Sequence, residues 1–234
     1  MAIQSNLKFS GTAGNLIFYQ RFGGFYVRSR PSTVKQTTAT KASAGKFGNA
    51  VRIAKAFRSG LQPLFNSALD KTTILRFNNA VYRYLLADDA SVDNLPFISG
   101  FEFNEQSLLK ERMKLTVSVN RNIAGDMQLM LPAFVPEQKM VAPAYTRDVT
   151  LRLAAAVCNM KTQTLTDCRD DELSIVYDDH LFPSQVISLP FELSDDEIMV
   201  IGCSLRYEAM RKGLLKDVSD VRWMPAGIVW AGRN

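Results

Sequence analysis

Hydrophobic and polar positions follow three different patterns along this chain. Within residues 5–31, the segments 15–21 and 25–30 are rich in aromatic and β-branched side chains, which favour the pleated surface of a strand. Gly23 and Gly24 lie between these segments and predict a tight hairpin turn, because glycine readily adopts the positive φ angles of such turns. The pattern therefore predicts a small β-meander.

The second pattern is helical. Between residues 39 and 61 apolar residues recur at spacings of three and four, which places them on one face of a helix. Gly45 and Gly48 weaken the first half of this helix by roughly 1 kcal/mol each relative to alanine, so we expect a closely packed neighbour there. A second helix is expected after Asp70, with a buried stripe formed by Ile74, Phe77, Val81 and Leu85.

From about residue 96 the period changes to two. Met113, Leu115, Val117 and Val119 alternate with polar residues, as in a strand with one buried face. Several further short segments of this kind follow, with turn-rich connections between them. The sequence thus predicts an α+β protein, with a basic β-hairpin and helix head over residues 1–95 and an antiparallel Ig-like β-sandwich of about seven strands over 96–234.

The opening segment also carries a resemblance. Residues 8–28, KFSGTAGNLIFYQRFGGFYVR, are similar to an N-terminal pattern of an uncharacterised Bacteroidota protein family, in which G-x-x-G-x-x-x-F-Y and a glycine turn precede a basic helix. The similarity extends to residues 43–58, 98–104 and 131–135. It implies a short β-and-helix head and a β-sandwich body, and it assigns no activity.

The charge is distributed unevenly. The chain has 28 basic and 23 acidic residues, and its first acidic residue is Asp70. Ten basic residues precede Asp70, so residues 70–234 hold 18 basic against 23 acidic residues. A segment of one sign attracts polyanions or a surface of opposite charge. Because no apolar run has the length of a signal peptide or a membrane helix, we expect a cytoplasmic protein without membrane insertion.

The candidate chemical groups favour a protein without enzymatic activity. His180, the only histidine, follows two aspartates and could be a general base, a metal ligand or a solvated loop residue; no second histidine accompanies it. The acidic runs 170–172 and 195–197 lack the spacing of a calcium loop and are expected in solvated turns. Three cysteines fit a reducing compartment, and a bridge from Cys158 to Cys168 stays open. No metal or cofactor is expected.

The basic head remains as the functional signal. Its aromatic residues alternate with arginines, an arrangement that could stack on nucleic-acid bases, pack on the helix, or form a docking arm for protein. We expect a non-enzymatic structural or assembly protein whose head docks onto another subunit or a partner complex, and nucleic-acid binding is the alternative. The predicted partner-binding residues are Arg21, Arg28, Arg30, Lys41, Arg52 and Lys55.

Overall fold

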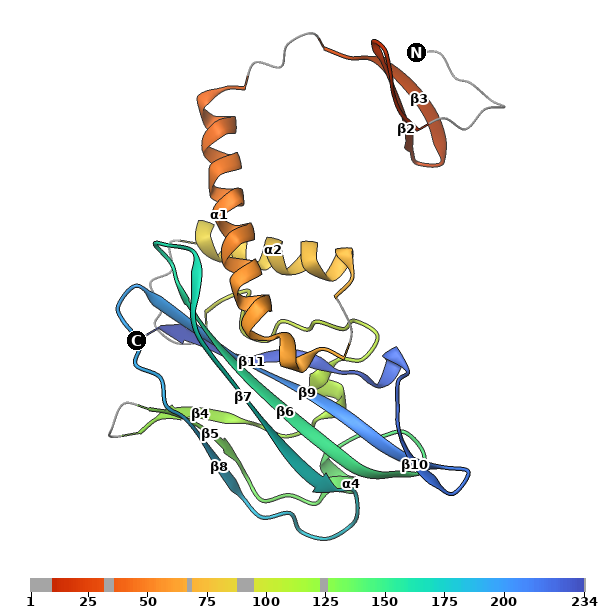
Figure 1. Ribbon diagram of the computed structural model, residues 1–234, viewed down its shortest axis with the longest axis vertical. Coiled ribbons are helices and arrows are strands. Elements are labelled where there is room, and N and C mark those ends of the chain that lie inside the picture. The colour runs from red at the N-terminus through yellow and green to blue at the C-terminus, as the bar shows by residue number, and fades with distance from the viewer. Residues whose placement is uncertain (1–9, 32–35, 67–68, 88–94, 123–125, 234) are drawn as a thin grey trace. The chain divides into compact units, whose positions relative to one another are not determined.

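The computed structural model describes residues 10–31, 36–66, 69–87, 95–122 and 126–233, and these residues form an α+β fold (Figure 1). The chain divides into two compact units, Met1–Ser43 and Ala44–Asn234, whereas the sequence-based division was placed at residue 95. None of the described helices is long and apolar enough to cross a lipid bilayer.

The first unit contains a three-stranded meander. Its strands β1 (Gly11–Ala13), β2 (Leu16–Arg21) and β3 (Gly24–Ser29) pair antiparallel in that order. The first strand that the sequence predicts, residues 6–10, lies outside the described residues except for Ser10, and the observed first strand occupies residues 11–13, where a turn is expected. The turn between β2 and β3 is shifted by one residue from the prediction, because Gly24 already pairs with Arg21 and Phe22 and Gly23 make the turn. Both turn residues have positive φ angles, 48° and 77°, which is the pattern of a type I′ hairpin turn.

Two long helices precede the main sheets. Thr37 Oγ1 accepts the backbone N–H of Thr40 at 3.1 Å, at the start of α1 (Thr38–Gly60). Asp70 Oδ1 accepts the N–H of Thr73 at 2.7 Å and so caps α2 (Lys71–Leu86). In α1 the buried residues are Ala50, Ile53, Ala54, Ala56, Phe57 and Gly60. In α2, Phe77 and Val81 are buried as predicted. The predicted Ile74 and Leu85 are only half-buried, and Thr73 and Tyr84 are buried beside them.

A five-stranded antiparallel sheet forms the centre of the second unit. Its order is β10-β9-β6-β7, and β11 also pairs with β9. The central strands β6 and β9 are buried on both faces, unlike the half-buried strands that the alternation predicted. The strands are β6 (Thr146–Asn159), β7 (Thr164–Val176), β9 (Glu197–Arg211), β10 (Leu214–Asp217) and β11 (Ala226–Arg233).

Different layers cover the two faces of this sheet (Figure 1). On one face lies a three-stranded sheet of order β4-β5-β8, whose Leu129 shares a hydrophobic core with Leu151 and Leu153 of β6. On the other face, Phe57 of α1 and Phe77 of α2 share a second core with β6 and β9. The smaller sheet is formed by β4 (Ser118–Arg121), β5 (Met127–Leu131) and β8 (Gln185–Leu189).

This layering corrects part of the predicted fold class. The α+β class is confirmed, but the strands show no clear Ig-like sandwich, because helices cover one face of the larger sheet. The predicted strand that contains Met113 begins only at Ser118. The remaining short helices are α3 (Leu109–Arg112) and α4 (Pro136–Lys139), with single 3-10 turns η1 (Gln62–Leu64) and η2 (Val221–Trp223).

Small residues allow the end of α1 to lie against the sheet. A Cβ atom added at Gly60 would be 2.5 Å from Cβ of Ala156 in β6 and 3.0 Å from Cδ1 of Leu165. By contrast, a Cβ added at Gly45 or Gly48 would meet nothing within 4 Å, so the closely packed neighbour expected there is absent among the described residues. The close approach therefore occurs at Gly60.

This contact predicts opposite effects for two alanine substitutions in one helix. Gly60→Ala should lower the free energy of unfolding by about 1–3 kcal/mol, because its methyl group overlaps that of Ala156. The matched control, Gly48→Ala, should raise it by up to about 1 kcal/mol, since alanine is the better helix former and has room there. Urea denaturation measures both values, and a neutral or stabilising Gly60→Ala would contradict the packing.

Candidate functional site

Two of the predicted binding residues, Arg21 and Arg28, lie on one face of the meander. The β2–β3 register places Tyr19 opposite Tyr26 and Ile17 opposite Arg28, and Arg21 follows Tyr19 at a spacing of two. The rings of Tyr19 and Tyr26 stack with centroids 5.7 Å apart. The guanidinium of Arg28 lies 5.8 Å from the Tyr19 ring centre. We call Tyr19, Arg21, Tyr26 and Arg28 the basic aromatic face.

The hairpin ends in an exposed aromatic side chain. Phe22 is 92% exposed, and the guanidinium of Arg21 lies 5.0 Å from its ring centre. The left-handed φ of 48° costs an L-residue about 1–2 kcal/mol, and asparagine or glycine ordinarily takes this position. A bulky ring is therefore presented to solvent at a conformational cost. We call Arg21 and Phe22 the hairpin tip.

The opposite face of the meander is apolar. Phe18, Phe25 and Val27 are half-buried, and Leu16 is exposed. None of the side chains described in this sheet is fully buried. The aromatic residues of the head thus do not form a closed core within the meander.

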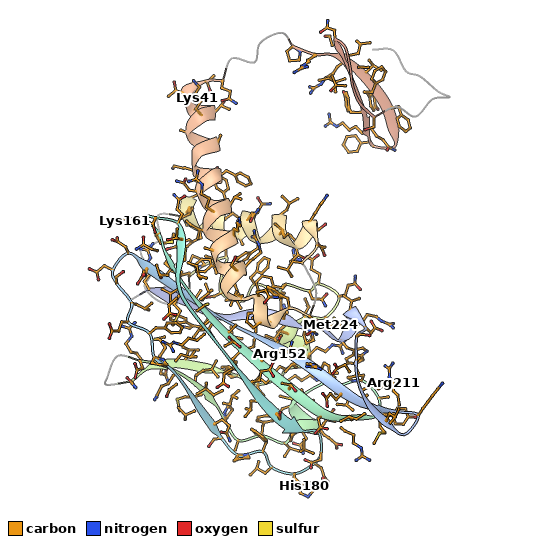
Figure 2. The ribbon with its side chains drawn as sticks, in the orientation of Figure 1. Lys41, Arg152, Lys161, His180, Arg211 and Met224 are labelled. Atoms are coloured by element: carbon orange, nitrogen blue, oxygen red, sulfur yellow. The ribbon has the colours of Figure 1, made fainter. Side chains whose placement is uncertain are left out.

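The remaining predicted residues divide between the two units. Arg30 is exposed just after β3, and its backbone N–H donates to the carbonyl of Asn15 at 2.7 Å. Lys41 is exposed in the first turn of α1 (Figure 2). Arg52 and Lys55 are exposed on α1 within the second unit, where the Arg52 guanidinium donates to Oε1 of Gln163 at 2.7 Å. Four of the six residues therefore belong to the first unit.

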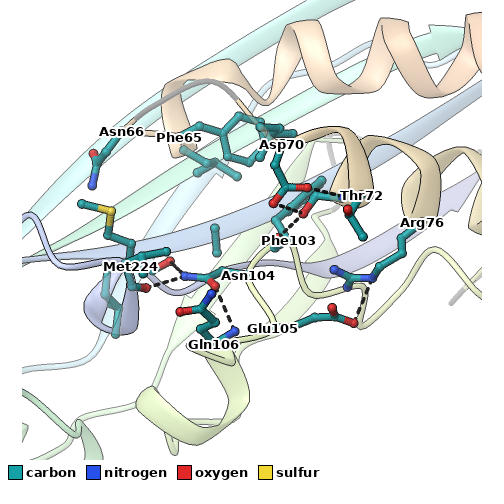
Figure 3. A pocket seen from close by; sticks show the side chains of 16 residues that line it. Phe65, Asn66, Asp70, Thr72, Arg76, Phe103, Asn104, Glu105, Gln106 and Met224 are labelled. Atoms are coloured by element: carbon teal, nitrogen blue, oxygen red, sulfur yellow. Dashed lines mark hydrogen bonds and ion pairs between the residues drawn. The ribbon is translucent and has the colours of Figure 1, made fainter. Parts of the chain in front are cut away.

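A cavity of about 350 Å³ opens in the second unit beside the start of α2 (Figure 3). Apolar side chains line part of it, among them Leu69, Phe103 and Met224. Two carboxylates, Asp70 and Glu105, also line it and are exposed. The cavity combines an apolar lining with two carboxylates and the guanidinium of Arg76.

Hydrogen bonds fix the wall of this cavity. The Asn104 side-chain amide donates to the carbonyls of Val221 at 2.7 Å and Met224 at 2.9 Å, and its oxygen accepts the N–H of Gln106 at 3.0 Å. Nearby, Nε of Arg76 lies 3.1 Å from Oε1 of Glu105. Sequence reasoning missed this site because its residues come from four separate segments that no spacing connects.

The groups considered for catalysis do not converge. His180 has an 84% exposed side chain, and its Nδ1 lies 3.1 Å from Oδ2 of Asp178, which fits the solvated-loop interpretation (Figure 2). Within the described part of the chain, no group of three or more His, Cys, Asp or Glu residues could hold a metal ion. The acidic run 170–172 was expected in a turn, but it lies inside β7, where its side chains are exposed.

Glu197, at the start of β9, is nearly buried. Its carboxylate accepts the N–H of Ser194 at 3.0 Å, and this hydrogen bond holds the pKa of Glu197 below its ordinary value. A lowered pKa keeps the side chain ionised at neutral pH. Glu197 thus fixes a turn of the chain by accepting a hydrogen bond.

Comparison with known proteins assigns no role to these sites. No protein-family model matches this chain, and neither a curated protein nor a solved structure matches it. The basic aromatic face, the hairpin tip and the cavity are the features that indicate a function.

The three cysteines are free thiols in different surroundings. Cys168 pairs with Ala156 across the β6–β7 ladder and is exposed, so the possible bridge to Cys158 is not formed. Burial, with a smaller contribution from Glu197, raises the pKa of the Cys158 thiol to about 11. Burial also raises the pKa of Cys203.

These surroundings predict selective alkylation. Iodoacetamide at neutral pH should modify Cys168 in the native protein, while Cys158 and Cys203 should react only after unfolding, because both are buried and protonated. Peptide mass mapping before and after denaturation measures this difference. Cys168→Ser is the control and should leave the native protein unmodified; rapid native labelling of Cys158 would contradict the burial.

Proposed function

We propose that this protein is a non-enzymatic assembly protein whose basic head docks onto an acidic surface of another subunit. The basic aromatic face is the observation that carries the proposal, because it gathers arginines and tyrosines on one side of a sheet. Tyrosine and arginine are enriched at the energetically dominant positions of protein interfaces. No acidic residue precedes Asp70, so the head has no internal neutralisation.

The second unit offers an acidic complement. Among the described strands β7 pairs only with β6, so its other edge is open. Asp167, Asp170, Asp171 and Glu172 are exposed along it. Glu172 already pairs with Arg152 at 2.8 Å and Asp167 with Arg169 at 3.7 Å, which leaves Asp170 and Asp171 as the main source of negative charge. A head that binds the body of the next copy makes a heterologous contact, and such contacts generate rings or filaments.

Nucleic-acid binding is the second candidate, and the same face favours it. Tyrosine rings can stack on bases while arginines contact phosphates, as in sequence-tolerant single-strand binding proteins. Such binding would weaken steeply with salt because bound counterions are released.

Charge reversal tests the docking proposal. In sedimentation velocity the wild type should form oligomers at about 50 mM NaCl and dissociate at about 500 mM, because salt screens the exposed charges. The double variant Arg28→Glu, Arg30→Glu should stay monomeric at both concentrations, with an unchanged melting temperature, since both side chains are exposed. The control Arg211→Glu, Lys212→Glu makes the same change of charge in the second unit and should assemble like the wild type.

Two outcomes would contradict this proposal. One is a wild type that is monomeric at every concentration and salt level, and the other is a double variant that assembles normally. A gel shift with single-stranded DNA and RNA at about 50 mM salt then decides the alternative. A shift that Arg28→Glu, Arg30→Glu abolishes, in a monomeric wild type, would establish nucleic-acid binding instead.

A further inference from the structure

Charge attraction alone does not explain the exposed aromatic ring at the hairpin tip. A type I′ turn favours Asn-Gly, yet Phe22 occupies the first position and is 92% exposed. Beside it, the Arg21 guanidinium lies 5.0 Å from the ring centre. The tip therefore presents an aromatic ring and a guanidinium together, and arginine is one of the residues enriched in binding hot spots.

The cavity beside α2 has the complementary chemistry. Phe103 and Met224 contribute apolar surface, Asp70 and Glu105 contribute carboxylates, and Arg76 contributes a guanidinium (Figure 3). Its volume of about 350 Å³ lies at the lower end of the range typical of ligand pockets, where one large side chain fits. The hydrogen bonds of Asn104 hold its wall, so the cavity exists before any ligand arrives.

We propose that the hairpin tip of one copy inserts into this cavity of a second copy. The inference rests on the proposed function and names this cavity, in place of the β7 edge, as the surface that the hairpin tip binds. Phe22 enters the apolar part, and Arg21 faces the carboxylates of Asp70 and Glu105. Glu105 already pairs with Arg76 through Oε1, and its second oxygen is available for a further donor.

Charge favours the cavity over a second hairpin tip as the binding partner of the tip. Two tips would bring arginines of like charge together, whereas the cavity offers carboxylates. Every copy has one tip and one cavity on different units, so each contact joins two unlike surfaces. Each copy can then bind two others, one through each site.

Phe22→Asn removes the aromatic ring and preserves the turn, so it tests binding by Phe22 apart from any structural role of the turn. Asparagine followed by Gly23 is the preferred type I′ sequence, so the variant should keep or raise the melting temperature. It should nevertheless weaken assembly by about tenfold or more, because the anchoring ring is gone. Leu214→Asn is the control: it removes another exposed apolar side chain, 61% exposed, outside the tip and the cavity, and should assemble like the wild type.

The cavity is tested by filling it. Thr72 is an exposed residue of α2 that lines the cavity, and Thr72→Trp should weaken assembly by about tenfold or more. Asn79 is exposed on the same helix but does not line the cavity, so Asn79→Trp should have no effect. Circular dichroism checks that both variants are folded.

Mixing the two defective variants is the decisive experiment. Phe22→Asn retains an intact cavity and Thr72→Trp retains an intact tip, so each alone should stay monomeric at a concentration just sufficient for the wild type to assemble. In a mixture they should form a one-to-one dimer and nothing larger in sedimentation velocity, because only one productive contact is possible. If the mixture stays monomeric, or if either variant assembles like the wild type, the inference is overturned. If Arg28→Glu, Arg30→Glu alone abolishes assembly, the docking proposal stands without this contact.

Discussion

The burial of β6 and β9 on both faces is the constraint on which the second unit depends. On the face toward the helices the side chains of β6 are small, with Ala154 and Ala156, and on the other face most are larger, with Leu151 and Leu153. Small residues let the end of α1 approach closely at Gly60. At Gly202 of β9 an added Cβ would lie 2.5 Å from Cδ1 of Leu64 in η1. Leu64 also lines the cavity, so the packing of η1 on the sheet helps to form it.

Sequence patterns predicted the elements better than their assembly. Period and glycine position located the hairpin, both long helices and most of the strands, since these depend on local spacing. The arrangement of the layers was not predicted correctly, because alternating strands indicate a sheet with one solvated face. The continuous apolar runs at 153–158 and 198–203 carry the missing signal: strands without alternation are covered on both faces. The helices α1 and α2 cover the second face of the larger sheet.

The candidate sites show the same limit. Charge alone indicated the head, and strand alternation would place Arg21 and Arg28 on one face once the turn is known. The one-residue shift of that turn was not predictable from the glycines, because Phe22 takes a backbone conformation that glycine ordinarily takes. The cavity depends on contacts between residues 64–76, 103–106 and 221–226, which no local pattern connects.

The central claim is that Phe22 of one copy lies in the cavity of another. Photo-crosslinking tests it most directly, with p-benzoyl-phenylalanine in place of Phe22 and a mixture of ¹⁴N- and ¹⁵N-labelled copies. The account predicts mixed-isotope cross-links from position 22 to residues that line the cavity, such as Leu69 and Met224. Cross-links confined to single copies, or directed to another surface, would contradict it.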